Sequence, residues 1–404
     1  MGIYQELGIQ PIINLYGPAT RLSGSLMEPP VSEAMFQAAQ ESVRMDQLQA
    51  AASHIIAEIT GAEAGYVTAG AAAGLTLGTA ACMTGLDVAR MNRLPETIGM
   101  PNEVIIPREH RSGYDHAIRA AGAYLVEVGM NEVFSGAGVR GTEAWEIEAA
   151  ITDRTAAIAY FYHLGSKSSL KEVINVGKKH HIPVIVDAAA QLPPAENLRK
   201  FISLGADLVC YSGGKAIRGP QSSGILCGRR DLIASAALQN LDLDEDFCTW
   251  DPPPSLIPKE QMRGLPRHGI GRGLKVAKEE IVALLVALQL FTKEKCREDA
   301  TRFQGLLERI ASHLQRVPHV EAQITTTTTG SAFPLLQIKL NETELRQSAF
   351  QISKGLKNGT PPIYANTVLL SEGILIINPM NLNKELADIV AQRMVDVLSS
   401  SSSL

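Results

Sequence analysis

The chain has 404 residues, more than one simple hydrophobic core usually contains, so we expect two domains or more. Hydrophobic residues make up 45% and charged residues 20%, an ordinary balance for a soluble globular protein that excludes a largely disordered one. Lys and Arg number 37 against 42 Asp and Glu, and the resulting formal charge of -5 disfavours a protein that holds a nucleic-acid backbone by charge.

In chain order, the first 45 residues are interpreted as an N-terminal arm, with a short strand at 11–15 and a helix from about 32 to 40. A longer helix follows at 46–61, where apolar residues recur at helical spacing. Apolar strands then alternate with helices. The predicted strands are 65–68, 103–107, 155–162, 182–187, 208–212 and 223–227, and the predicted helices between them are 70–85, 113–121 and 170–180.

Strands buried on both faces and separated by helices predict an α/β domain with a mostly parallel sheet, here residues 46–275. A long helix at 274–290 leads out of this domain. Residues 276–404 are expected to form that interdomain helix and a smaller α+β domain. Its predicted elements are helices at 300–316 and 384–398 and strands at 320–325, 334–340 and 373–378. The threonine run at 325–329 reads as a strand end or solvated loop, and 399–403 as a low-complexity tail.

The five cysteines are scattered, and none forms a Cys-x-x-Cys pair, so we expect reduced thiols and a cytoplasmic protein. The first residues lack the cationic start and apolar stretch of a signal peptide. The longest apolar run, from Ile281 to Phe291, is too short to span a bilayer. Membrane and nucleic-acid partners are therefore not expected. His180 and His181 have no spaced partners, so no metal site is expected either.

The strongest chemical feature is Lys215, in a small-residue turn directly after an apolar strand. Alone, it could be a surface lysine in a loop. However, another buried strand ends in Asp187, and a carboxylate there lies on the edge where open α/β sheets bind ligands. A lysine amine for a covalent bond and a carboxylate for the ring nitrogen are what pyridoxal phosphate (PLP) requires.

A third feature is the segment 68–74, which is rich in alanine and glycine and lies between a strand and a helix. Backbone N–H groups at such a helix start can bind an anion, although small residues also serve close helix packing. The segment has neither the Gly-x-Gly-x-x-Gly fingerprint of dinucleotide sites nor a Walker A ending, which disfavours a nucleotide site.

Three segments carry a family resemblance: 211–221 followed by 224–226, 58–63 leading into the Ala-rich loop, and 274–281. They resemble the bacterial selenocysteine synthase (SelA-like) family of fold-type I PLP enzymes, over roughly residues 10–395. Within that family the chain is most similar to the D-glucosaminate-6-phosphate ammonia-lyase branch. The resemblance implies the fold-type I architecture: a large domain with a mostly parallel sheet, and a smaller C-terminal α+β domain.

The resemblance also implies residue roles. Lys215 would hold PLP, Asp187 would pair with its ring nitrogen, and His110 would stack on the ring, although His110 could instead be a capping or surface residue. The residues implied for the phosphate are Gly70, Ala71 and Ser212, and Ala72 is a further cofactor-binding candidate.

The remaining candidates are polar residues near the same sheet edge and arginines in loops. Gln191 could reach the phenolic oxygen of PLP or be an ordinary loop residue, and His163 and Ser166 are weaker candidates for substrate binding. Arg21 and Arg272 could clamp a carboxylate or phosphate, or could simply be solvated. Arg272 could act on a neighbouring subunit's site in a homodimer or larger homo-oligomer. Arg111 and Arg218 are further anion-binding candidates.

These expectations favour a PLP-dependent lyase that releases ammonia from a hydroxylated amino acid, perhaps a sugar-derived and phosphorylated one, by α-proton abstraction and β-elimination. Racemisation, aldol cleavage and transamination remain alternatives. A selenocysteine synthase-type transferase fits less well, because the extra N-terminal tRNA-binding domain has no room before Pro11 and the chain is acidic. A cofactor-binding regulator without turnover is an option from another class.

Overall fold

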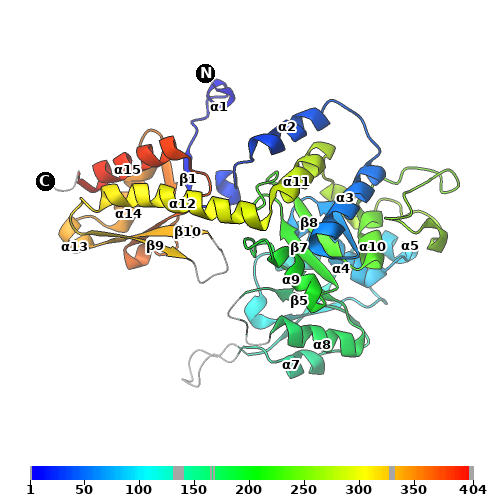
Figure 1. The fold of residues 1–404 in the computed structure, drawn as a ribbon. Helices are drawn as coiled ribbons and strands as arrows, with labels where there is room; N and C mark the ends of the chain where they lie inside the picture. The colour runs from blue at the N-terminus through cyan, green and yellow to red at the C-terminus, as the bar shows by residue number, and fades with distance from the viewer. Residues whose placement is uncertain (1, 131–140, 164–165, 167–168, 327–332, 400–404) are drawn as a thin grey trace. The chain divides into compact units, whose positions relative to one another are not determined.

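The computed structural model describes residues 2–130, 141–163, 166, 169–326 and 333–399. The chain divides into two compact units (Figure 1). The large unit is Met27–Phe291, and the small unit combines Met1–Leu26 with Thr292–Leu404. Within the described residues, no helix combines the length and apolar composition needed to cross a bilayer.

The large unit is built on a seven-stranded sheet in the order β2-β8-β7-β6-β5-β3-β4. Only β8 runs antiparallel to its neighbours; the ladder from β7 to β4 is parallel throughout. The strands are β2 (Ala64–Thr68), β3 (Glu103–Pro107), β4 (Tyr124–Val128), β5 (Thr155–Phe161), β6 (Val184–Asp187), β7 (Leu208–Ser212) and β8 (Gly224–Gly228). The prediction of a mostly parallel α/β sheet is confirmed.

The helices of the large unit are α2 (Pro29–Ala38), α3 (Met45–Thr60), α4 (Ala71–Thr84), α5 (Val88–Arg93), α6 (Asp115–Ala120), α7 (Ala144–Ala149), α8 (Leu170–His180), α9 (Asn197–Leu204), α10 (Arg230–Asn240) and α11 (Lys278–Leu290). Helices α3, α4, α7, α8, α9 and α10 contact the sheet, and the other helices of the large unit pack on helices. α4 is largely buried, and its small residues let it approach the sheet closely. A Cβ on Gly74 would lie 3.2 Å from Cys210 Sγ, and one on Gly78 would lie 3.1 Å from Leu208 Cδ1. The Ala-rich segment therefore serves helix packing as well.

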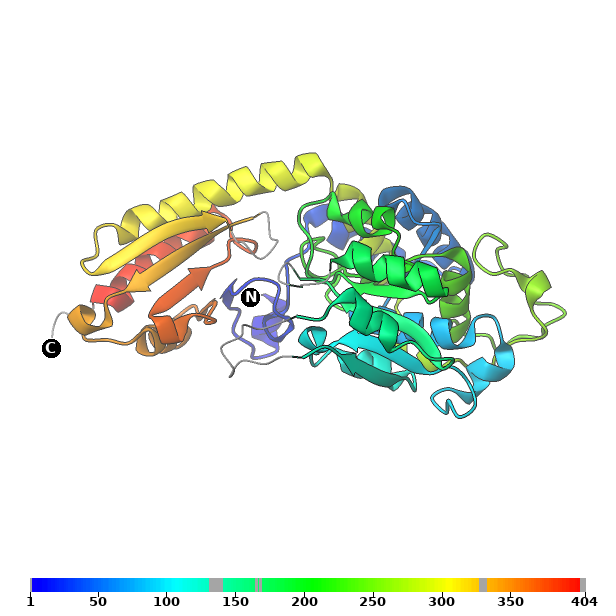
Figure 2. The same cartoon turned by 90° about the horizontal axis from the view of Figure 1, so that it is seen from below.

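The small unit has a three-stranded antiparallel sheet in the order β12-β10-β9. Its strands are β9 (Val320–Thr326), β10 (Pro334–Leu340) and β12 (Ile374–Ile377), and its longer helices are α12 (Lys293–Leu314), α14 (Ala349–Lys357) and α15 (Lys384–Ser399). α12 packs on β9, β10 and α15 (Figure 2). Two short helices, α1 (Ile3–Glu6) and α13 (Glu342–Leu345), complete the unit.

The N-terminal residues join the small unit through one strand pair. β1 (Ile13–Leu15) runs parallel to β11 (Ile363–Ala365). The buried side chain of Asn14 fixes the following turn, because its Nδ2 donates to the carbonyl oxygens of Gly17 and Leu22 at 3.0 and 3.1 Å. α2 instead belongs to the large unit, where it packs on α11. The structure thus splits the predicted arm of residues 1–45 between the two units.

The starts of two predicted helices differ most from the structure. The predicted helix 274–290 begins only at Lys278, because residues 270–274 form a 3₁₀ turn and the side chain of Glu280 caps the backbone N–H of Ala277. α12 begins at Lys293 rather than near residue 300, where Thr292 Oγ1 accepts from the N–H of Lys295 at 3.1 Å. Of the threonine run, 325–326 end β9 and 327–329 lie outside the described residues, as do 400–403 of the tail.

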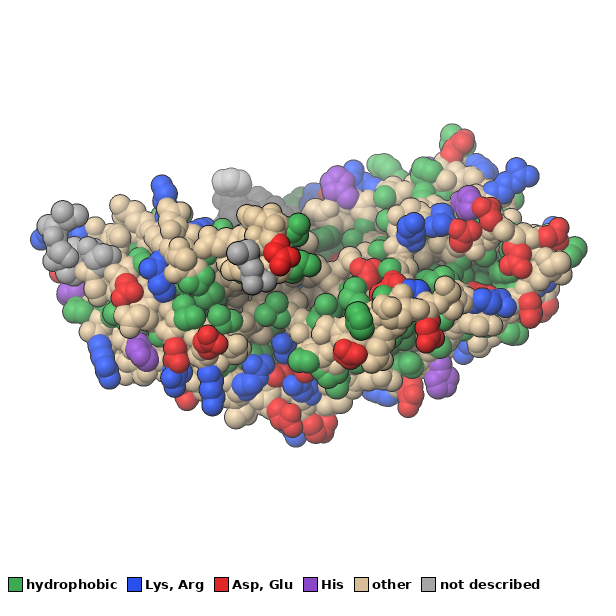
Figure 3. Space-filling model, turned by 90° about the horizontal axis from the view of Figure 1, so that it is seen from above, with side chains coloured by type: hydrophobic (Ala, Val, Ile, Leu, Met, Phe, Trp, Pro, Cys, Tyr) green, Lys and Arg blue, Asp and Glu red, His purple; other side chains and the backbone are tan. Residues whose placement is uncertain are grey.

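Charged side chains of both signs are interspersed over the face shown in Figure 3. Surface ion pairs occur in both units, such as Arg309 with Asp388 in the small unit and Arg229 with Asp231 in the large one. Positive and negative side chains, which are nearly equal in number in the sequence, are thus also mixed on this face.

Candidate active site

The carboxyl ends of the parallel strands bring the predicted chemical residues to one edge of the sheet. Asp187 ends β6, Ser212 ends the adjacent β7, and His110 follows β3 in a 3₁₀ turn. His163 follows β5, which lies between β6 and β3. This edge is where open α/β sheets bind ligands.

Lys215 lies in the turn after β7, and its charge interacts with that of Asp187. Burial lowers the pKa of Lys215, and the negative charge of Asp187 opposes that shift. Burial likewise raises the pKa of Asp187, opposed by the N–H of Ala189, which donates to Oδ1 at 2.9 Å, and by Lys215. The pair therefore couples a more nucleophilic amine with a partly buried carboxylate.

The turn that carries Lys215 tolerates no larger residues before it. A Cβ on Gly213 would lie 2.3 Å from Ser223 Oγ, and one on Gly214 would lie 2.6 Å from Gln221 Cα. Backbone hydrogen bonds close the turn, from Gly213 N to Ser223 O at 2.9 Å and from Arg218 N to Lys215 O at 3.0 Å. The two glycines thus place Lys215 through close backbone packing.

The Ala-rich segment forms the start of α4 beside β8 and β7. Gly70 is the N-cap of α4 with φ +93°, in the left-handed region that favours glycine. Gly224 pairs with Ser212 across the β7–β8 ladder, and a Cβ on Gly224 would lie only 2.4 Å from the carbonyl carbon of Gly70. The start of α4 and the end of β7 are therefore neighbours, as a phosphate site shared by Gly70, Ala71 and Ser212 requires.

The first turn of α4 suits an anion. The N–H groups of a helix's first turn lack partners within the helix, and the helix dipole favours negative charge there. The turn contains Ala71, Ala72 and Ala73, with no acidic side chain to compete for those donors. The residues present therefore fit the phosphate of PLP.

His110 is buried rather than a surface or capping residue, with 3% of its area exposed. Its Nε2 lies 2.8 Å from Ser166 Oγ, and its ring meets those of Tyr160 and His163 edge to face, with centroids 4.5 and 5.0 Å apart. Burial and, to a smaller extent, the charge of His163 lower the pKa of His110, Glu109 opposes them, and the net pKa is about 4. The imidazole is therefore neutral near pH 7.

Gln191 is engaged by the protein. Its side-chain Nε2 donates to the backbone carbonyl oxygen of Tyr162 at 2.9 Å, and its backbone carbonyl oxygen accepts from Asn197 Nδ2 at 2.6 Å. This contact favours the interpretation of Gln191 as an ordinary loop residue. Sequence reasoning missed Tyr160 of β5, whose ring meets that of His110 edge to face.

The arginines have protein partners. Arg218 has φ +63° and pairs with Glu28 at 3.0 Å. Arg111 pairs with the buried Asp115, and Arg21, in the small unit, lies over the ring of Tyr16 at 4.6 Å.

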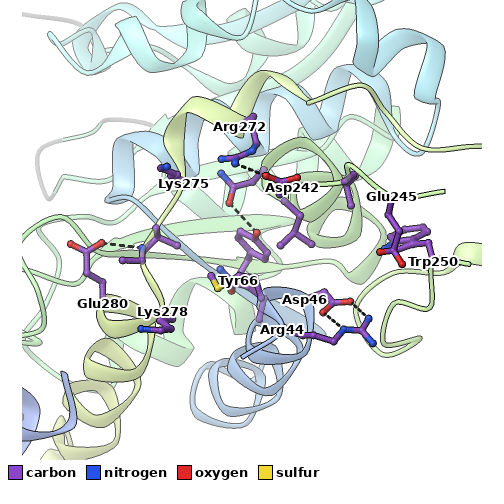
Figure 4. Close-up of a pocket in the computed structure, with 17 residues that line it drawn as sticks. Arg44, Asp46, Tyr66, Asp242, Glu245, Trp250, Arg272, Lys275, Lys278 and Glu280 are labelled. Atoms are coloured by element: carbon purple, nitrogen blue, oxygen red, sulfur yellow. Dashed lines mark hydrogen bonds and ion pairs between the residues drawn. The ribbon is translucent and has the colours of Figure 1, made fainter. Parts of the chain in front are cut away.

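Arg272 lines a separate cavity of about 690 Å³ in the large unit (Figure 4). The lining is mixed in charge and includes two ion pairs, Arg272 with Asp242 at 2.5 Å and Arg44 with Asp46 at 2.6 Å. The phenol of Tyr66 at its floor bonds Asn240 at 3.0 Å. None of Lys215, Asp187 and His110 is part of the lining, so the structure does not bring Arg272 together with them in this cavity.

Comparison with known proteins agrees with this geometry. Residues 31–215 match the DegT/DnrJ/EryC1/StrS aminotransferase family. The chain is 32% identical to a D-glucosaminate-6-phosphate ammonia lyase of Salmonella typhimurium, over 96% of both chains. It is 30% identical to a 5'-C-glycyluridine monooxygenase-decarboxylase of a Streptomyces species, over 98% of this chain and 92% of that one.

More distant relatives share the scaffold. An L-seryl-tRNA(Sec) selenium transferase of Geotalea daltonii is 23% identical, over 82% of this chain and 68% of its own. A solved structure of D-glucosaminate-6-phosphate ammonia-lyase covers both chains fully, with a TM-score of 0.82 and 29% identity. A serine palmitoyltransferase with PLP, at 12% identity and a TM-score of 0.55, covers 97% of this chain and 89% of its own and shares the fold. The chain therefore belongs to the SelA-like family of fold-type I, PLP-dependent enzymes, in the branch that contains the D-glucosaminate-6-phosphate ammonia lyases.

Proposed function

We propose that this chain is a PLP-dependent lyase that releases ammonia from a hydroxylated amino acid of the D-glucosaminate 6-phosphate class. The observation that carries the proposal is the partly buried Lys215–Asp187 pair beside the start of α4. It occurs in a chain that aligns with a D-glucosaminate-6-phosphate ammonia lyase over nearly the whole of both chains.

The residues at the sheet edge fit the cofactor. Lys215 would hold PLP through its amine, and Asp187 would pair with the ring nitrogen. The backbone N–H groups of Ala71 and Ala72, with the hydroxyl of Ser212, would bind the phosphate, and His110 would lie against the ring. The N–H of Gly70, also expected there, instead donates to the carbonyl oxygen of Thr68 at 2.8 Å. When bound, PLP supplies an electron sink for the negative charge that proton loss leaves on the substrate's α-carbon.

The chain's own residues would move the protons. Because burial lowers the pKa of Lys215, its Nζ is more often neutral than a free lysine amine and can accept the α-proton. The same Nζ then donates a proton to the departing β-hydroxyl oxygen. Loss of water, followed by addition of water, releases ammonia and leaves a 2-keto acid.

A second function has a specific observation in its favour. The Streptomyces relative, a monooxygenase-decarboxylase by name, is nearly as similar to this chain as the ammonia lyase is. Such an activity would consume O₂ and release CO₂ from an amino acid, whereas the lyase needs no O₂. Oxygen dependence therefore separates the two.

The test compares wild-type protein with Lys215→Ala, and uses Lys171→Ala, an exposed lysine of α8, as the matched control. With PLP and D-glucosaminate 6-phosphate, wild type and the control should release ammonia and a keto acid under argon. Lys215→Ala should release neither, and should lack the visible absorbance of lysine-bound PLP. Ammonia release by Lys215→Ala at the wild-type rate refutes the role of Lys215. O₂ uptake with CO₂ release, without ammonia, supports the second function instead.

We also infer that the protein is cytoplasmic and works as a homo-oligomer with shared sites. All five cysteines are free thiols, which suits a reducing compartment. Because Arg272 points into a cavity apart from Lys215, its anion-binding role is assigned to the site of a second copy. Co-expression tests this: if Arg272→Ala and Lys215→Ala are each inactive alone, mixed oligomers should regain activity. Mixed oligomers as inactive as their parents contradict shared sites.

A further inference from the structure

Ser166 is joined to His110 across two adjacent strands. Ser166 follows β5, His110 follows β3, and β3 pairs with β5 in the sheet. Ser166 Oγ lies 2.8 Å from His110 Nε2, and it also donates to the carbonyl oxygen of His163 at 3.2 Å. A third partner is the phenol of Tyr160. The serine that sequence reasoning assigned to the substrate is thus occupied by the protein.

Counting hydrogens assigns the tautomer of His110. A serine hydroxyl has one proton and two lone pairs. If the proton goes to the His163 carbonyl, Ser166 Oγ has only lone pairs left to offer His110, and these accept from His110 Nε2–H. The opposite assignment puts the imidazole proton on Nδ1.

Nδ1 of His110 is buried and has no hydrogen-bond partner among the described residues. An N–H at this position would be a buried donor without an acceptor, which is strongly disfavoured. A bare Nδ1 leaves only an unused lone pair. The ring also carries no second proton near pH 7, because burial lowers its pKa to about 4.

We propose that Ser166 is a positioning residue: it holds His110 with its proton on Nε2, so that bare Nδ1 accepts a hydrogen bond from an ammonium or hydroxyl group of the bound substrate. The substrate half of this statement rests on the proposed function, whereas the tautomer does not. In this state His110 accepts a hydrogen bond but has no proton to donate from Nδ1. The leaving hydroxyl must therefore receive its proton from another group, which fits Lys215.

The test is ¹⁵N NMR of protein labelled in the histidine rings, reconstituted with PLP, with His110→Gln identifying the His110 signals. Wild type at pH 7.5 should show a protonated Nε2 and an unprotonated Nδ1. Ser166→Ala should shift His110 toward a mixture of tautomers, and Ser166→Thr, which keeps the hydroxyl, should restore the wild-type signals. Ser203→Ala, an exposed serine of α9, is the control and should leave them unchanged.

Each outcome decides the proposal. A proton on Nδ1 in wild type, or wild-type signals in Ser166→Ala, overturns the role of Ser166. Addition of D-glucosaminate 6-phosphate should move the Nδ1 signal, and kcat of Ser166→Ala should fall about three- to tenfold, as for one lost neutral hydrogen bond. An unmoved Nδ1 signal while ammonia is released refutes the substrate contact alone. If no ammonia is released at all, the proposed function fails while the tautomer result stands.

Discussion

The buried imidazole of His110 makes the stability of the large unit depend on pH. In the unfolded chain a histidine has a pKa of 6.5, whereas burial lowers the pKa of folded His110 to about 4. Between these values the unfolded state binds more protons than the folded state. The free energy of unfolding is therefore at its full value above pH 6.5 and falls as the pH drops toward 4.

The size of the effect follows from the two pKa values. At pH 5 the unfolded histidine is almost fully protonated while folded His110 is mostly neutral, which costs about 2 kcal/mol relative to pH 8. The full difference, reached below pH 4, is about 3 kcal/mol. Two charged neighbours contribute to the lowered pKa with opposite signs, His163 lowering it and Glu109 raising it.

His110→Gln isolates this contribution, because glutamine keeps a donor for Ser166 but does not titrate. Urea unfolding of cofactor-free protein, followed by tryptophan fluorescence, reports on the large unit alone, since both tryptophans, Trp145 and Trp250, lie there. Between pH 8 and pH 5 the wild type should lose about 2 kcal/mol more than His110→Gln. Equal losses in the two proteins refute the account of a buried, neutral His110.

Two further substitutions test the site and its support. Gly224→Ala places a Cβ 2.4 Å from the carbonyl carbon of Gly70 and should weaken PLP binding about tenfold or more in an absorbance titration. Gly113→Ala, whose Cβ meets nothing within 4 Å, should not, and equal affinities contradict the packing argument. Asp115→Ala removes a carboxylate that is 4% exposed and paired with Arg111. This substitution should lower the free energy of unfolding by about 3 kcal/mol. The exposed Asp388→Ala, which breaks the surface pair with Arg309, should cost much less, so a similar loss in both variants is the adverse result.

The parallel sheet, and the edge of it that carries the candidate site residues, could be predicted because continuous apolar runs indicate buried strands. Asp187, Ser212 and Gly70 each follow a run of buried residues, and parallel strands bring such ends together. β4 was missed because it is an edge strand, with Tyr124 and Glu127 exposed, and so lacks a continuous apolar pattern. The predicted start of α12 lay too far along the chain, because charged residues dominate the first turns of this helix and hide its apolar spacing.

The directions of side chains and the contacts between segments far apart in the chain could not be predicted from the sequence pattern. The contact of Gln191 with the Tyr162 carbonyl depends on a loop conformation that no residue spacing encodes. The cavity beside Arg272 arises where α3, α10 and the 270–274 turn meet, segments far apart in the chain. Likewise, no local pattern indicates that residues 13–15 pair with residues 363–365.

That strand pair has a consequence for how the protein is made. The large unit is one continuous stretch, Met27–Phe291, so it can close as soon as it has left the ribosome. β1 is translated before it but must wait for β11, near the other terminus, to find its partner. A nascent chain interrupted near residue 291 would therefore carry a complete seven-stranded sheet and an N-terminal strand with nothing to pair with.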